Sequence, residues 1–338
     1  MLTEKENYLR MLSGEIPEWI PEYTFGVIPG AEPPASVMAE PEILVGHRIN
    51  GGGPDHWGVN HIPTYETGNA LIPEPNNFIL RDIREWRDVI KAPRLDGIDW
   101  EAMVKRDIGR VRINRAESAL AMNLHVGYFQ NLMEFMGFSE GLTAMIEEPE
   151  EVHALLDYMC DFYMSVAERT IDLFKPDVLT FMDDTAAWAA PFISRGMYEE
   201  FLVPRHSRWA KMGLDRGLPM TMHNCGKCEG ILDLLVDMGI TMWEPAQTCN
   251  DLLGIRKRFG NKLCVAGGWD GRGRLLAPDV TDEEIRQSAR DTMDALAPGG
   301  GYAWCGMFLG PLDDPETARR NEVLTKEAKA YARAFYKR

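Results

Sequence analysis

The sequence predicts an α/β protein, a (β/α)8 TIM barrel with an N-terminal helical and loop elaboration over the barrel mouth. After about residue 78, short β-prone runs alternate with longer helical stretches, which is the pattern of parallel βαβ units. Six such units between residues 123 and 306 fit a closed barrel better than a flat sheet. Polar residues able to do chemistry also follow the ends of these runs, where barrels of this kind carry their active sites.

The N-terminal part differs from the rest of the chain. The first 20 residues predict a short amphipathic helix, with Tyr8, Leu9, Met11 and Leu12 on or near one face. Residues 28–76 are rich in Gly and Pro and are too irregular for repeated βα units. We therefore expect one barrel domain over residues 1–338, in which residues 1–76 form the elaboration.

The barrel itself is predicted from six β-prone runs and the helical stretches between them. The expected strands are NLHVGYF (123–129), DVLTFMDD (177–184), PMTMHNC (219–225), TMWEPA (241–246), LCVAGGWD (263–270) and YAWCG (302–306). Long helices are expected over residues 150–174 and 194–217. No GxGxxG fingerprint follows the first strand, which disfavours a dinucleotide-binding fold.

Composition and charge exclude several classes of function. The net charge of −16 and the pI near 4.9 argue against nucleic acid and against an anionic membrane surface as partners. The apolar runs are far shorter than the ~20 residues of a membrane helix, and the N-terminus lacks the apolar region of an export signal. We therefore expect a cytoplasmic protein, with a homodimer as an open alternative to the monomer.

A metal site is predicted where the third and sixth of these strands end. His223 and Cys225 stand two residues apart, so on an extended strand both side chains point to one face. Cys305 ends a later strand and is the candidate third ligand across the barrel mouth. Imidazole and thiolate ligands select Zn²⁺ over Mg²⁺ or Ca²⁺, and three protein ligands leave a fourth position open. Glu244 is the candidate for that position at rest.

The other cysteines offer alternatives to this ligand set. Cys225 and Cys228 form a CxxC, which is compatible with a redox dithiol or with a zinc site that uses Cys228. A zinc knuckle usually has a second such pair, and the sequence has none. Cys160 and Cys264 lie in apolar runs and are expected in the core, whereas the place of Cys249 stays open.

Further site residues are expected around the barrel mouth. Asp183 or Asp184 is the candidate for orienting the substrate or donating a proton, with a helix N-cap as the alternative for one of the two. Aromatic residues of the loop and strand ends suit a flat apolar ring, although about half of them are expected to pack the core. The residues expected to bind substrate are Trp57, His56, His61, Trp188, Trp243 and Trp269, with Tyr65, Phe129 and Trp304 adding aromatic surface.

Several stretches resemble one known family. HNCG, then ILDLLVDMGITMWEP, then FGNKLCVAGGWD resemble the uroporphyrinogen decarboxylase superfamily, as do TEKENYLRMLSGEIPEWIPEY, DVLTFMDD and GGGYAWCG. The resemblance covers most of the chain and implies the barrel. The Arg-rich, RQAGR-type segment of true uroporphyrinogen decarboxylases is missing, and GGGPDHWGVNH stands in that region. The HxC…C arrangement resembles the zinc-dependent, corrinoid-linked methyltransferase branch, such as the methyltransferase I component of anaerobic O-demethylases.

This resemblance implies ligands, a cofactor and a reaction. It makes His223, Cys225 and Cys305 zinc ligands and places Glu244 at or near the ion. The branch transfers methyl groups to or from a corrinoid, here expected on a partner protein because no DxHxxG-type cobalamin motif is present. The favoured reaction takes the methyl group from an aryl methyl ether to Co(I). The alternatives are methyl transfer from the corrinoid to a thiol, a cofactor-free decarboxylase and a zinc-stabilised binding module.

Overall fold

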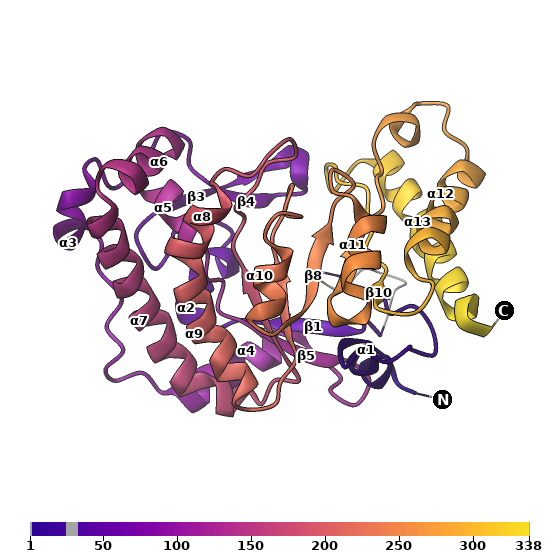
Figure 1. Cartoon of the computed structure of the whole chain (residues 1–338), viewed down its shortest axis with the longest axis horizontal. Helices are drawn as coiled ribbons and strands as arrows, with labels where there is room; N and C mark the ends of the chain where they lie inside the picture. Colours follow the sequence, from indigo (N-terminus) through magenta and orange to yellow (C-terminus); the bar gives the residue numbers. More distant parts are fainter. Residues whose placement is uncertain (1, 25–32, 338) are drawn as a thin grey trace.

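The computed structural model describes residues 2–24 and 33–337, and its centre is a curled sheet of seven parallel strands (Figure 1). Their order is β1 (Ser36–Ala39), β5 (Ala119–Asn123), β6 (Val178–Met182), β7 (Met220–His223), β8 (Ile240–Ala246), β9 (Cys264–Gly267) and β10 (Tyr302–Ala303). Glu22 makes a further parallel bridge to Trp304, directly after β10. The TIM-barrel type of fold that the sequence predicted is confirmed.

Helices cover the outside of the sheet. The longest is α7 (Pro149–Phe174), which confirms the helix expected over residues 150–174. The stretch 194–217 holds α8 (Arg195–Met197), a π-helical turn (Tyr198–Leu202) and α9 (Val203–Leu214), so it too is helical as expected. The others are α3 (Trp86–Val89), α4 (Trp100–Val111), α5 (Tyr128–Met136), α6 (Phe138–Glu147), α10 (Leu232–Asp237), α11 (Leu252–Phe259), α12 (Asp282–Leu296) and α13 (Pro315–Ala334).

The first helix closes the end of the barrel where the strands begin. Helix α1 (Glu4–Leu12) starts at a capping box of Thr3 and Glu6. Its residues Tyr8, Met11 and Leu12 are buried in one cluster with small side chains of the strands, including Ala119 and Ala266. The backbone N–H of Lys5 donates to the carbonyl of Glu117, just before β5. The predicted amphipathic helix is therefore present, but it lies opposite the barrel mouth, because its apolar face fills the bottom of the barrel.

The rest of the elaboration is divided between the barrel and its mouth. Helix α2 (Glu42–Ile49) is followed by an antiparallel sheet of β2 (Gly53–Pro54), β3 (Asn60–Thr64) and β4 (Ala70–Pro73). Figure 1 shows this sheet at the end of the molecule opposite α1. Residues 36–39, however, form the barrel strand β1, so this part of the stretch 28–76 belongs to the barrel and not to an elaboration over its mouth. Residues 28–32 of that stretch lie outside the described part.

The first expected strand also needs correction. Strand β5 ends at Asn123, and Tyr128 already begins α5, so residues 123–129 are not a strand. The carboxylate of Asp183 accepts hydrogen bonds from the backbone N–H groups of Phe129 and Gln130 at the start of α5. This tertiary capping satisfies N–H groups of the first turn of α5, where sequence pattern alone continues the extended run.

No helix in the described ranges is both long and apolar enough to cross a membrane.

Candidate metal centre and adjoining pocket

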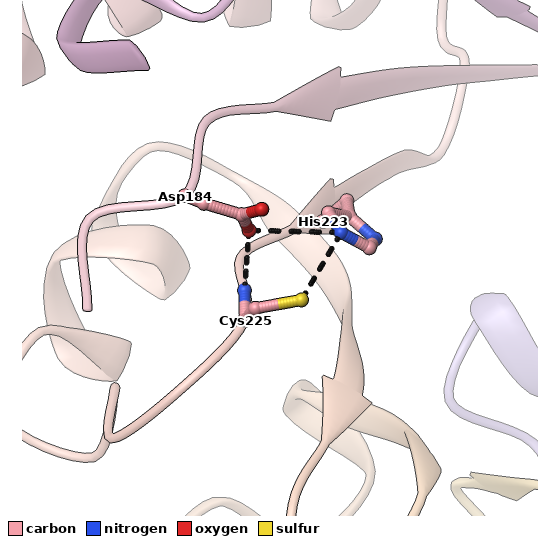
Figure 2. Close-up of side chains that lie close together, drawn as sticks. All are labelled: Asp184, His223 and Cys225. Carbon is pink, nitrogen blue, oxygen red and sulfur yellow. Dashed lines mark hydrogen bonds and ion pairs between the residues drawn. The ribbon is translucent and has the colours of Figure 1, made fainter. Parts of the chain in front are cut away.

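Neighbouring strand ends bring three chemically active side chains together. His223 is the last residue of β7, in register with Met182 of β6 on one side and Glu244 of β8 on the other. Cys225 follows in the next loop, and Asp184 follows β6. Figure 2 shows Asp184, His223 and Cys225 converging from the two strand ends. The adjacency of the parallel strands thus assembles residues that are about 40 positions apart in the chain.

The distances in this group suit a single cation. One ligand atom from each of Asp184, His223 and Cys225 lies within 4.8 Å of the others. His223 Nε2 is 3.4 Å from Cys225 Sγ and 3.6 Å from Asp184 Oδ1. The backbone N–H of Cys225 donates to the same Asp184 Oδ1 at 2.6 Å, which fixes the carboxylate beside the thiol. Nitrogen, sulfur and oxygen donors in this combination fit Zn²⁺.

Glu244 stands behind the imidazole. It is fully buried, its Oε2 is 2.9 Å from His223 Nδ1, and its Oε1 accepts a hydrogen bond from the Tyr23 hydroxyl at 2.9 Å. A carboxylate on one ring nitrogen orients a histidine and leaves the other nitrogen for a metal. The geometry therefore gives Glu244 an orienting position, whereas the sequence had suggested it as a fourth ligand.

Electrostatics in this group favour charge on the imidazole. Burial lowers the pKa of His223, but the carboxylate of Glu244 and the Cys225 thiol more than offset it, and the pKa lies well above its ordinary value. Burial raises the pKa of Cys225, although His223 opposes the shift. A divalent cation that binds here would have to displace one proton from the His223 imidazolium and one from the Cys225 thiol. Binding would therefore release protons to solvent.

Cys305 lies close to the group but not within it. It follows β10 and packs against the buried cluster inside the barrel. Burial raises the pKa of its thiol to about 12, and the charges of Glu244, Glu22 and Cys225 add to this shift. In the described chain it is not among the ligand atoms that lie within 4.8 Å of one another. Its predicted role as a ligand stays a prediction.

The loop after His223 is held by its neighbours. Asn224 is fully buried, and its side chain exchanges hydrogen bonds with the backbone N–H and the hydroxyl of Thr185. Gly226 has φ +87°, and a Cβ there would stand 2.4 Å from the carbonyl oxygen of Ala186. The Cys228 thiol donates to the carbonyls of Asn224 and Cys225. Cys228 thus serves the loop and is outside the metal-ligand group.

The adjacent aspartates have different surroundings. Asp183 is fully buried, caps the start of α5 and lies 3.2 Å from Nε2 of the buried His206. Asp184 has a side chain that is 30% exposed, and it belongs both to the metal-ligand group and to the wall of a pocket. Of the two candidates, Asp184 is therefore the one placed to touch a substrate.

An apolar pocket of about 440 Å³ adjoins Asp184. Phe129 and Phe192 stack in its wall, with ring centroids 5.8 Å apart and an angle of 13° between the planes. Its lining residues are Pro73, Glu74, Pro75, Asn76, Phe78, Phe129, Gln130, Met133, Glu134, Gly137, Phe138, Asp184 and Phe192. Only Phe129 and Asp184 among them had been expected, because the rest lie on helices and loops that carry no recognisable motif.

The other expected substrate-binding residues lie elsewhere. Trp57 and Trp243 are buried and donate to the Tyr163 hydroxyl and to the Asn224 carbonyl. The indole N–H of Trp269 donates to Ser288 Oγ. Trp188 is 41% exposed, with the Arg272 guanidinium 3.6 Å from its ring centroid. His56 contacts Tyr163, and His61 belongs to a second group of side chains that is described below. Of these described residues, none lines the pocket.

Comparison with known proteins identifies the family. Residues 83–306 match the sequence model of the uroporphyrinogen decarboxylase (URO-D) family, which is more than half of the chain. The chain belongs to this family. No curated protein matches the sequence.

A solved structure shares the fold of this chain. A methyltransferase from Methanosarcina mazei has a TM-score of 0.61 over 98% of this chain and 99% of its own, at 14% identity. A D-psicose 3-epimerase and an L-ribulose 3-epimerase match 68% and 70% of this chain (83% and 80% of their own), both at 12% identity and with TM-scores of only 0.36 and 0.35. The likeness to the methyltransferase extends over nearly the whole of both chains, so the elements outside residues 83–306 belong to the same fold.

Proposed function

We propose that this URO-D-family protein is a zinc-dependent methyltransferase, which moves the methyl group of an aryl methyl ether to the Co(I) corrinoid of a partner protein. The observation that carries the proposal is the place of Asp184, which is shared by the group of metal ligands and the wall of the aromatic pocket. A bound ion and a bound substrate would therefore be neighbours.

The donors of this chain determine how zinc would be held. His223 Nε2, Cys225 Sγ and Asp184 Oδ1 would bind the ion, and Cys305 is proposed as a further ligand from the resemblance to corrinoid-linked methyltransferases. When bound, zinc supplies a Lewis acid that stabilises negative charge on the ether oxygen as it becomes a phenolate. Glu244, buried behind His223, would hold the ring in place and keep Nε2 directed at the ion.

The pocket supplies the recognition of the ring. The stacked faces of Phe129 and Phe192 suit a flat apolar substrate, and a volume of about 440 Å³ is within the range of small-molecule sites. The described lining contains three carboxylates, from Glu74, Glu134 and Asp184, and no basic side chain. A neutral methoxylated ring is therefore favoured over one that carries a carboxylate.

The test is a methyl-transfer assay with purified, zinc-loaded protein. Reduced cobalamin would be followed by its spectrum, with guaiacol-like ethers in one arm and thiols plus methylcobalamin in the other. The proposal expects methylcobalamin to form with the ether, and the Phe192→Ala variant to need a higher ether concentration for half-maximal rate. Consumption of methylcobalamin only with a thiol would replace it by the reverse transfer.

A decarboxylase is tested by the same preparation. Decarboxylation of a tetrapyrrole acid by metal-stripped protein, together with no methyl transfer by zinc-loaded protein, would reject the methyltransferase.

A further inference from the structure

A second group of ligand side chains lies apart from the candidate metal centre. Asp55 precedes β3, His61 lies in β3, and Glu134 lies on α5. One ligand atom from each of the three lies within 4.8 Å of the others. The antiparallel β2–β3 hairpin and the helix are brought together by folding, so the group has no counterpart in a sequence motif.

Each of these three side chains forms hydrogen bonds through one of its polar atoms, which leaves a second polar atom that could bind a cation. Asp55 Oδ1 accepts from the backbone N–H groups of Trp57 and Val59, at 2.8 and 2.9 Å. His61 Nδ1 is 3.0 Å from the Val59 carbonyl oxygen and donates to it, which leaves the lone pair on Nε2. Glu134 Oε2 accepts from the Asn131 amide at 3.0 Å. Hydrogen bonds of this kind orient the ligands of metal sites.

The negative charge of the group is only partly balanced by basic side chains. The charge of Arg48 acts to lower the pKa of Glu134, but among the described residues no Lys or Arg forms an ion pair with Asp55 or Glu134. Burial raises the pKa of both carboxyls, that of Glu134 to about 7, with the charge of Asp55 contributing. Two partly buried carboxylates this close together are stabilised by a cation between them.

A buried histidine beside the group also has unused hydrogen-bonding capacity. His47 is 6% exposed, and its ring lies against that of His61, with centroids 4.5 Å apart and an angle of 32° between the planes. Its Nδ1 has no hydrogen-bond partner. Buried polar atoms are normally paired, so an unpaired nitrogen against a candidate ligand indicates that a bound group or water completes this region.

We propose that Asp55, His61 and Glu134 form a second divalent-cation site, separate from the candidate zinc centre. Two carboxylates and one imidazole, without a thiol, favour a harder ion than the Cys225 group does, and Mn²⁺ is the ion to which we commit. The site goes beyond the proposed methyl transfer, and cation binding does not depend on it, whereas the role of the ion toward a ring substrate rests on that proposed function.

The position of Glu134 gives the ion a role. Glu134 also lines the aromatic pocket, in whose wall Asp184 of the first centre lies too. A cation bound at Glu134 would place positive charge at a pocket whose described lining otherwise offers only carboxylates as charged groups. The bound cation would thus offset the negative charge of the pocket wall and attract an electron-rich oxygen substituent of a ring substrate.

The experiment measures Mn²⁺ binding to the full chain. Protein carrying one equivalent of Zn²⁺ is titrated with Mn²⁺, and free Mn²⁺ is followed by its paramagnetic resonance signal. We expect one Mn²⁺ per chain, and a dissociation constant raised by roughly tenfold or more in Glu134→Gln and in His61→Asn. Asn keeps an N–H for the Val59 carbonyl, so the second variant removes only the ligand nitrogen. Glu140→Gln, an exposed carboxylate on the adjoining α6, is the control and should bind Mn²⁺ as the wild type does.

Location of the ion provides the second measurement. Anomalous scattering from Mn²⁺-soaked crystals should give a peak among Asp55, His61 and Glu134. Equal affinity in the wild type and in both folded variants, no Mn²⁺ binding by the wild type, or a peak elsewhere would overturn the proposal. Neither measurement uses methyl transfer, so a failure of the proposed function is recognised separately.

Discussion

At the scale of single residues, the candidate metal centre depends on which nitrogen of His223 is free. Glu244 engages Nδ1, and the Tyr23 hydroxyl in turn holds Glu244, so a chain of buried hydrogen bonds directs Nε2 toward Cys225 and Asp184. Burying the Glu244 carboxylate costs free energy of desolvation. This cost is offset only if each of its two oxygens has a hydrogen-bond partner. Each Glu244 oxygen does have a partner here.

The first prediction concerns this orienting carboxylate. Glu244→Gln keeps the shape of the side chain but loses the charge that holds His223, so zinc affinity should fall by roughly 10- to 100-fold. Competition with a chromophoric chelator measures it, and Glu140→Gln serves as the control. An unchanged zinc affinity in the folded variant would show that Glu244 does not orient a ligand.

The second prediction separates the adjacent aspartates. Asp183→Asn weakens the cap of α5 and should lower the free energy of unfolding by about 1–2 kcal/mol. Asp184→Asn should leave stability within about 0.5 kcal/mol but reduce methyl transfer by roughly tenfold or more. Thermal unfolding and the cobalamin assay measure the two effects. The assignment would be contradicted if Asp183→Asn lost methyl transfer at unchanged stability while Asp184→Asn lost stability.

Sequence pattern predicted the motif residues better than the pocket. His223 and Cys225 could be found because a two-residue spacing at a strand end has a fixed geometric meaning. Asp184 was one of two candidates, and only the fold shows that its neighbour Asp183 is turned to α5. Phe192 could not be found, because it comes from an irregular segment and reaches the pocket through tertiary contacts alone.

At the scale of elements, the HNCG loop combines a strand end with a turn that only glycine permits. Gly226 must adopt φ +87° while it lies against the backbone of Ala186. This close approach ties the loop after β7 to the loop after β6, and therefore sets the spacing between Cys225 and Asp184. The glycine is thus part of the geometry of the candidate centre although it offers no ligand.

A third prediction follows for this loop. Gly226→Ala should lower the free energy of unfolding by about 1–3 kcal/mol, since the backbone conformation and the contact with Ala186 are both incompatible with a Cβ. Zinc affinity should fall with it. Gly230→Ala, in the same loop, meets no atom within 4 Å and is the matched control. Equal stability of the two variants in urea unfolding would contradict this account of the turn.

The fourth prediction concerns the segment that bridges to Trp304. Burial raises the pKa of Glu22 to about 7, although the charge of Lys329 opposes the shift. The folded protein therefore holds a proton that the unfolded chain has already released, and stability falls as the pH rises from about 4.5 to about 7. Glu22→Gln should remove a loss of about 2 kcal/mol across this window.

Urea unfolding at about pH 5 and about pH 8 measures this effect. The exposed Glu18→Gln is the control and should keep the pH dependence of the wild type. If the wild type and Glu22→Gln had parallel profiles, Glu22 would not be the group responsible.

The elements that sequence pattern misplaced have a common cause. The strand expected over residues 123–129 begins where β5 ends, because the run 119–129 is mostly apolar and its period does not tell a strand from the start of a helix. The start of α5 is capped by Asp183, which is distant in the chain. Likewise, the four residues of β1 are too few to be recognised among glycines and prolines, and they are strand because they pair with β5.

At the scale of the whole molecule, the two ends of the barrel have different tasks. Helix α1 closes the end where the strands begin, with apolar side chains that complete the interior cluster. The opposite end carries the candidate metal centre and the pocket, together with the β2–β4 sheet, whose place Figure 1 shows. The division between a stabilising end and a chemical end is the general rule for such barrels, and it is why the strand-end residues could be predicted as one constellation.

The central claim is that His223 and Cys225 hold a metal ion beside the pocket, and zinc-edge X-ray absorption of protein loaded with one equivalent of Zn²⁺ tests it most directly. We expect a mixed shell, with nitrogen and oxygen at about 2.0–2.1 Å and sulfur at about 2.3 Å. One sulfur ligand in the shell would correspond to Cys225 alone, and two would correspond to Cys225 together with Cys305. The Cys225→Ser variant should have one sulfur ligand fewer than the wild type. A shell of nitrogen and oxygen without sulfur, unchanged in Cys225→Ser, would contradict the account.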